Sequence, residues 1–127
     1  MFRRRPPHPV LEPFLHMAAA LDDAQRALLA AIPTARDDGI PLAEAIVAFE
    51  RGLAETEARM PAWRTPATAA MHDECAAAIR AARVECETLR LEPETLSFEA
   101  LNARIGDVLH PLEVFADTER ALRRGGS

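Results

Sequence analysis

Residues 97–124 read SFEALNARIGDVLHPLEVFADTERALRR, an order of apolar and polar side chains that is typical of a long amphipathic helix. Apolar positions follow one another at alternating steps of three and four residues, which keeps them on one side of a helix. This line of residues, here called a seam, comprises Phe98, Leu101, Ile105, Val108, Leu112, Phe115, Glu119 and Leu122. We expect Ser97 to cap the helix and Pro111 to bend it, because proline removes one backbone hydrogen bond.

Three earlier segments contain seams with the same spacing. The first seam comprises Leu11, Phe14, Ala18, Leu21, Gln25, Leu28 and Ile32. The second comprises Leu42, Ile46, Phe49, Leu53, Thr56, Met60 and Trp63. The third comprises Thr68, His72, Cys75, Ile79, Ala82, Cys86 and Leu89. We expect Pro33 and Pro93 to end the first and third helices and Pro61 to disrupt the end of the second, because proline does not continue a helix.

The four seams together predict an all-α protein. Each corresponds to a helix of roughly 20 to 26 residues, or about 30 to 39 Å at 1.5 Å per residue. Matched helices joined by short loops favour an up-down-up-down antiparallel four-helix bundle. The same spacing occurs in coiled coils, so helical hairpins that pair as a dimer are the alternative. We expect a disordered basic, proline-rich arm over residues 1–9, a single bundle domain over 10–124 and a flexible tail over 125–127.

Composition and charge narrow the class of partner. The net charge of −5 and the pI of 5.4 argue against nucleic-acid binding by the body of the protein, because nucleic-acid-binding proteins present a basic face.

No segment approaches the run of about eighteen apolar residues that a membrane span requires. Cys75 and Cys86 are the only cysteines, and on one helix they lie about 16 Å apart, beyond the reach of a disulfide. We therefore expect reduced thiols and a cytoplasmic location.

Residues 71–75, MHDEC, contain several metal-binding side chains, and His72-Asp73-Glu74 has the H-x-E order of zinc-dependent deaminases. That chemistry needs two further thiolates in a P-C-x-x-C turn, which the chain lacks. The chain also contains no Glu-x-x-His pair of a di-iron bundle and no glycine-rich phosphate loop. These absences favour a protein that is not an enzyme.

One end of the predicted bundle carries polar seam residues. His72 lies nineteen residues before Leu91, and Glu119 lies twenty-one residues after Phe98, so their heights along antiparallel helices agree within about one turn. We therefore expect His72, Cys75 and Glu119 to converge, with Thr56 and Met60 nearby. The favoured interpretation is a hydrogen bond between His72 and Glu119 that satisfies two buried polar groups. The alternative is a small-ligand or metal site for Zn or Cu(I), since imidazole, thiolate and thioether are ligands for these ions.

The remaining charged feature is the arm, in which Arg3, Arg4 and Arg5 precede several prolines. Such an arm can hold an anionic partner, and Arg3, Arg4 and Arg5 are the candidate partner-binding residues. Because the seams leave little room for a buried active site, we expect a non-enzymatic accessory or interaction protein with a protein partner, or a homodimer. Metal or small-ligand binding at the polar end is the alternative function, and nucleic-acid binding through the arm ranks below it.

Overall fold

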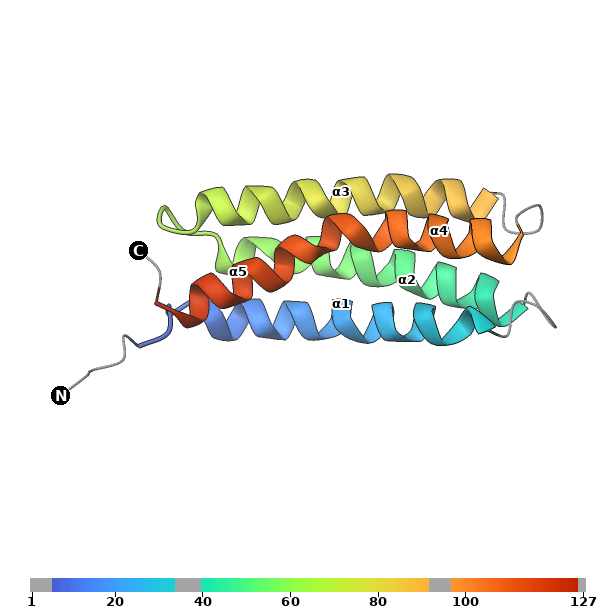
Figure 1. Ribbon diagram of the computed structural model, residues 1–127. Coiled ribbons are helices and arrows are strands. Elements are labelled where there is room, and N and C mark those ends of the chain that lie inside the picture. The colour runs from blue at the N-terminus through green and yellow to red at the C-terminus, as the bar shows by residue number, and fades with distance from the viewer. Residues whose placement is uncertain (1–5, 34–39, 92–96, 126–127) are drawn as a thin grey trace.

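The computed structural model describes residues 6–33, 40–91 and 97–125, and in these ranges it contains helices and turns but no strand. The helices are α1 (Leu11–Ala31), α2 (Ile40–Arg59), α3 (Ala69–Leu91), α4 (Phe98–Leu109) and α5 (Val114–Arg123). Helices α4 and α5 follow one another end to end and are here called the fourth rod, and successive rods run in opposite directions (Figure 1). One chain thus forms the up-down-up-down four-helix bundle that the seams predict.

The core confirms the spacing of the seams. All seven residues of the second seam are buried, with relative exposures of 2% or less. The other buried seam residues are Phe14, Leu21, Leu28, Ile32, Thr68, Cys75, Ile79, Ala82, Cys86, Leu89, Leu101, Ile105, Val108, Leu112, Phe115 and Leu122. Each fully buried Leu, Ile or Phe side chain contributes about 1.5 to 3 kcal/mol to stability relative to leaving it exposed. The apolar seams therefore hold the four rods together.

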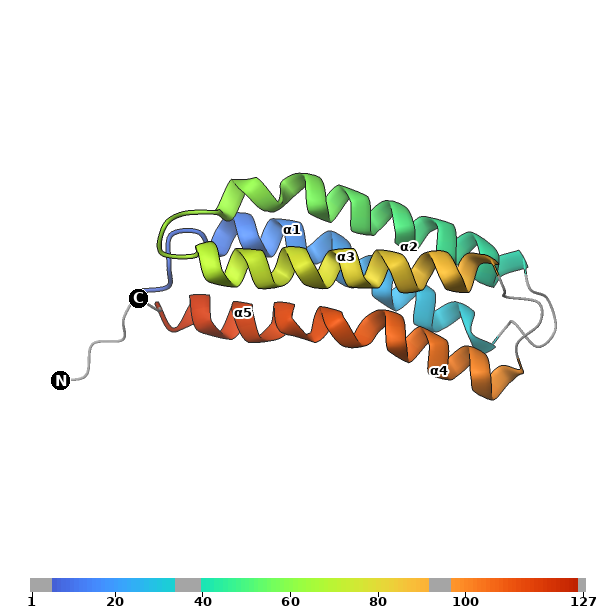
Figure 2. The same ribbon diagram turned by 90° about the horizontal axis from the view of Figure 1, so that it is seen from above.

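Prolines interrupt two rods, as expected. Helix α2 ends at Arg59 and continues as a 3-10 turn over Met60–Trp63, with Pro61 in its first turn. The fourth rod contains a second 3-10 turn, His110–Glu113, with Pro111 near its start. Figure 2 shows that the rod bends between α4 and α5.

The predicted fourth seam is wrong at one position, and the turn at Pro111 explains why. A 3-10 turn advances by about 120° per residue, whereas an α-helix advances by about 100°. The residues after the turn are therefore rotated slightly forward, so that Phe115 and Leu122 stay buried while the buried position between them moves by one residue. Thr118, at 3% exposure, is buried where the sequence predicts Glu119, whose side chain is 38% exposed.

The contacts between rods are uneven. Helix α1 packs against α2 and α5, whereas α3 packs against α2, α4 and α5. Figure 1 shows the fourth rod rising from the level of α1, at the end that carries the termini, toward the level of α3 at the other end. Helix α4 therefore lies close to α3 and further from α1.

Backbone hydrogen bonds close the end that carries the termini. The His8 N–H donates to the carbonyl of Leu122 at 2.9 Å, which ties the residues before α1 to the last turn of α5. Gly125 adopts a φ of 68° and donates to the same carbonyl at 3.1 Å, a helix ending that favours glycine. The expected arm over residues 1–9 is thus attached at His8. Residues 1–5, with Arg3, Arg4 and Arg5, and residues 126–127 of the tail lie outside the described residues.

None of the helices in the described ranges combines the length and the apolar character that crossing a membrane requires.

Candidate functional site

His72 lies near the start of α3, at the end of the bundle that carries the termini. Its side chain is 12% exposed, and its ring packs against the indole of Trp63 with the ring centroids 5.3 Å apart. The Nδ1–H donates to the Asp73 carboxylate at 3.0 Å, since an ionised carboxylate only accepts. The Nε2 atom is buried and has no hydrogen-bond partner among the described residues. His72 is therefore held by its sequence neighbour and by Trp63, and the expected bond to Glu119 is not formed.

The Asp73 carboxylate lies at the surface between His72 and Arg64. The hydrogen bond from His72, followed by the charge of Arg64 with its Nε at 3.6 Å, lowers the pKa of Asp73. The carboxylate is therefore ionised at neutral pH and available to accept from both neighbours. This group fixes the orientation of the imidazole at the edge of the bundle.

Cys75 lies one turn further along α3 and is fully buried. Its Sγ lies 3.4 Å from the hydroxyl of Thr118, the residue that occupies the position predicted for Glu119. Burial raises the pKa of Cys75 to about 11, and the contact with Thr118 only partly opposes this effect. A thiol with this pKa is protonated at neutral pH and is a poor nucleophile and a poor metal ligand.

Glu119 points away from this group. Its carboxylate accepts from the Nε of Arg123 at 3.0 Å on the outer side of α5. The structure thus brings Cys75 together with Thr118 and separates Glu119 from both Cys75 and His72. In the described part of the chain, no three His, Cys, Asp or Glu side chains cluster in a way that could hold a metal ion.

One polar feature of this end went unrecognised in the sequence. The hydroxyls of Thr65 and Thr68 each accept from the other residue's backbone N–H, at 3.2 and 2.9 Å, and so cap the start of α3 reciprocally. The spacing Thr65-Pro66-Ala67-Thr68, with a hydroxyl three residues after a cap, is the signal that could have identified it. The hydroxyl of Thr68 also donates to the carbonyl of Trp63 at 2.8 Å, so both hydroxyls are satisfied within the chain.

Three of the buried aromatic side chains gather at the same end. Phe14 packs edge-on against Trp63 with centroids 5.0 Å apart and stacks on Phe115 at 6.2 Å. The indole N–H of Trp63 donates to the sulfur of Met17 at 3.2 Å. All four side chains are buried and pack against each other, so this end of the bundle is a filled core with a polar edge.

A large hollow lies elsewhere, between α1 and the fourth rod. It is a solvent-accessible groove of about 720 Å³, here called the α1 groove. Its apolar floor is formed by Leu15, Ala18, Leu21, Leu109, Leu112 and Phe115. The floor residues Leu15, Ala18 and Leu109 are only half-buried, so they present apolar surface to the groove.

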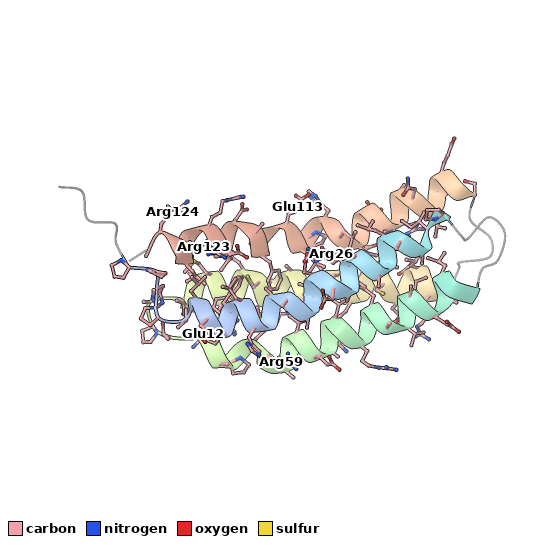
Figure 3. All side chains as sticks on the ribbon, turned by 90° about the horizontal axis from the view of Figure 1, so that it is seen from below. Glu12, Arg26, Arg59, Glu113, Arg123 and Arg124 are labelled. Carbon is pink, nitrogen blue, oxygen red and sulfur yellow. The ribbon has the colours of Figure 1, made fainter. Side chains whose placement is uncertain are left out.

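Small residues and the bend at Pro111 together create the α1 groove. Ala19 and Ala116 line its edges, and a Cβ built on Gly106 would meet no atom within 4 Å. The two walls are thus too far apart, and carry too little side-chain volume, to close on each other. Figure 3 views the molecule from the α1 side and shows the fourth rod beside α1.

Charged side chains line the edges of the groove with one sign predominating. Asp22 of α1 and Glu113 and Glu119 of the fourth rod contribute carboxylates. His110 is the only other titratable residue of the lining, and no arginine belongs to it, although all fifteen basic residues of the chain are arginines. The α1 groove therefore combines an apolar floor with acidic edges on both walls.

Comparisons with known proteins add no functional assignment to this geometry. No protein-family model matches the chain, and searches of curated proteins and of solved structures found no significant match.

Proposed function

We propose that the protein is a non-enzymatic interaction protein that holds a helix of a partner protein in the α1 groove. The observation that carries the proposal is the groove itself, a trough of about 720 Å³ with an apolar floor that α1 and the fourth rod leave open. The polar end supports this choice, because its aromatic side chains are packed against each other, its Cys75 thiol is protonated at neutral pH and its described residues form no cluster of metal ligands.

The dimensions of the groove suit a helix. Its lining on α1 extends from Leu15 to Gln25, which corresponds to about 15 Å along the helix axis or about three turns. A partner helix of this length places apolar side chains at positions i, i+3 or i+4 and i+7 on the floor. It would complete the bundle by covering the half-buried side chains of Leu15, Ala18 and Leu109.

A small molecule is the competing occupant, since pockets for such ligands have volumes of about 300 to 1,000 Å³. Small-molecule sites, however, enclose most of the ligand surface and present polar groups from several directions. The α1 groove is only partly enclosed by its two rods, so a small ligand there would keep part of its surface exposed. A second helix covers such a trough more completely.

Nuclear magnetic resonance can test the proposal with a defined probe. The probe is an 18-residue helical peptide with leucines at i, i+3, i+4 and i+7 and uncharged polar residues elsewhere. We expect it to shift the backbone amide signals of residues 15–25 and 106–119. Shifts confined to the outer faces of α2 and α3, or no shifts at millimolar peptide, would contradict the proposal.

A matched pair of variants makes this test specific. Ala116→Trp places a bulky side chain at the edge of the groove and should weaken binding at least about tenfold, since it fills space that the peptide needs. Ala77→Trp makes the same change at an exposed position of α3 and should leave binding unchanged. Equal affinity in both variants would show that the peptide does not occupy the groove.

A further inference from the structure

We infer that the helix held in the α1 groove is basic, with arginine or lysine on both sides of its apolar stripe. This inference rests on the proposed function and specifies the chemistry of the partner. It is carried by the three carboxylates of Asp22, Glu113 and Glu119, which line opposite walls of the groove.

The position of these carboxylates matches the edges of a bound helix. Asp22 lies on α1, and Glu113 and Glu119 lie on the other wall, separated by six residues or about 9 Å along the rod. A helix whose leucines point to the floor directs its flanking residues toward these two walls. Basic flanking residues would meet a carboxylate on each side, whereas acidic flanking residues would meet like charges.

Each carboxylate already pairs with a basic neighbour, but it can still accept hydrogen bonds from a basic residue of the partner helix. Asp22 pairs with Arg26 at 2.8 Å, Glu113 with His110 at 3.4 Å and Glu119 with Arg123 at 3.0 Å. Figure 3 labels Arg26 on α1 and Glu113 and Arg123 on the fourth rod.

All three carboxylates keep solvent-exposed surface, and pairs of this kind are weak. A carboxylate has about four acceptor positions, so it can accept a second cation without releasing the first. The neighbouring bases therefore moderate the attraction of the groove for cations but do not occupy it.

The experiment compares three peptides that share one leucine stripe and carry arginine, glutamine or glutamate at the flanking positions. Fluorescence anisotropy of labelled peptide measures the Kd of each with the full-length protein. We expect the arginine peptide to bind about tenfold more tightly than the glutamine peptide, and the glutamate peptide to bind most weakly. The advantage of arginine should shrink as salt rises from 50 to about 500 mM, because salt screens exposed charges.

Two triple variants separate the groove from the overall charge of the protein. The groove variant carries Asp22→Asn, Glu113→Gln and Glu119→Gln, and we expect it to lose most of the preference for arginine. The matched control carries Glu44→Gln, Glu55→Gln and Glu74→Gln, which removes the same three charges from exposed positions outside the groove lining. This control should retain the preference, and circular dichroism verifies that both variants are folded.

The possible results distinguish this inference from the proposed function. Equal binding of the arginine and glutamine peptides, with both weakened by Ala116→Trp, would overturn the basic partner and leave the groove as a binding site. Equal loss of preference in both triple variants would also overturn the inference, since attraction would then follow net charge alone. Failure of all three peptides to bind would instead contradict the proposed function.

Discussion

Helix α1 has two neighbours that it meets in opposite ways. On the side of α2 the backbones approach so closely that a Cβ built on Gly52 would lie 2.9 Å from the Cβ of Ala24. On the side of the fourth rod, a Cβ built on Gly106 would touch nothing within 4 Å. Both glycines lie inside helices, so local structure is not the difference. The contrast shows that α1 packs closely along α2 and leaves a groove toward the fourth rod, which it contacts through the stacked rings of Phe14 and Phe115.

Truncation of a large side chain should show the largest difference in stability between the side of α1 that faces α2 and the side that faces the fourth rod. Phe49→Ala removes a fully buried ring from α2 and should lower the free energy of unfolding by about 3 to 5 kcal/mol. Leu109→Ala, at a half-buried position of the groove, should cost only about 1 kcal/mol. Urea denaturation followed by circular dichroism measures both changes. Similar losses for the two variants would mean that the groove side is packed as tightly as the core.

The reaction rates of thiols provide a second comparison, between the buried core and the edge of the α1 groove. Burial raises the pKa of Cys75 to about 11 and that of Cys86 to about 12, so both thiols should react slowly with a disulfide reagent at pH 8. A thiol introduced by Ala19→Cys at the edge of the groove is exposed and should react at least about a hundredfold faster.

The rates are followed by release of the coloured leaving group, with the unsubstituted protein as the background. The rate for the native thiols should rise as pH increases toward 11, because the thiolate fraction of Cys75 increases with pH below its pKa. Rapid reaction of Cys75 or Cys86 in the folded protein at pH 8 would contradict their burial.

Gly52→Ala tests the close approach of α1 and α2 directly. Alanine favours a helix over glycine by about 1 kcal/mol, but the contact with Ala24 forces a shift that costs about 1 to 3 kcal/mol. We expect a net loss of about 1 kcal/mol in the free energy of unfolding. The Ala24→Gly background should relieve the contact, so Gly52→Ala should then become neutral or stabilising. A loss of the same size in both backgrounds would place the cause outside this contact.

Gly106→Ala should have the smallest effect on the free energy of unfolding, and its sign should be opposite to that of Gly52→Ala. Its Cβ enters open space, so only the gain in helix propensity remains, and stability should rise by about 0.5 to 1 kcal/mol. The melting temperature measured by circular dichroism reports the change, and Gly52→Ala is the matched comparison. A destabilised Gly106→Ala protein would indicate that α4 lies closer to α1 than the structure shows.

Much of the architecture could be predicted because it depends on local spacing. Leu42, Ile46 and Phe49 are buried as their three-four spacing indicates, and a proline marks each break within a rod. The candidate site was predicted less well. His72 and Cys75 lie at the expected end, but Glu119 does not join them, because continuing an ideal α-helical register through Pro111 ignores the tighter turn that follows it.

The α1 groove could not be predicted for a different reason. Ala18, Ala19 and Ala116 read in the sequence as ordinary helix-forming residues, and nothing local distinguishes Gly106 from Gly52. Whether a small residue leaves a hollow depends on how closely a rod that is distant in sequence approaches it. The chain by itself determined four amphipathic helices, their ends and their inward-facing side chains, since these follow from periodicity and backbone chemistry. Only the packing of the bent fourth rod decided that Thr118 is buried in place of Glu119 and that one side of α1 stays open.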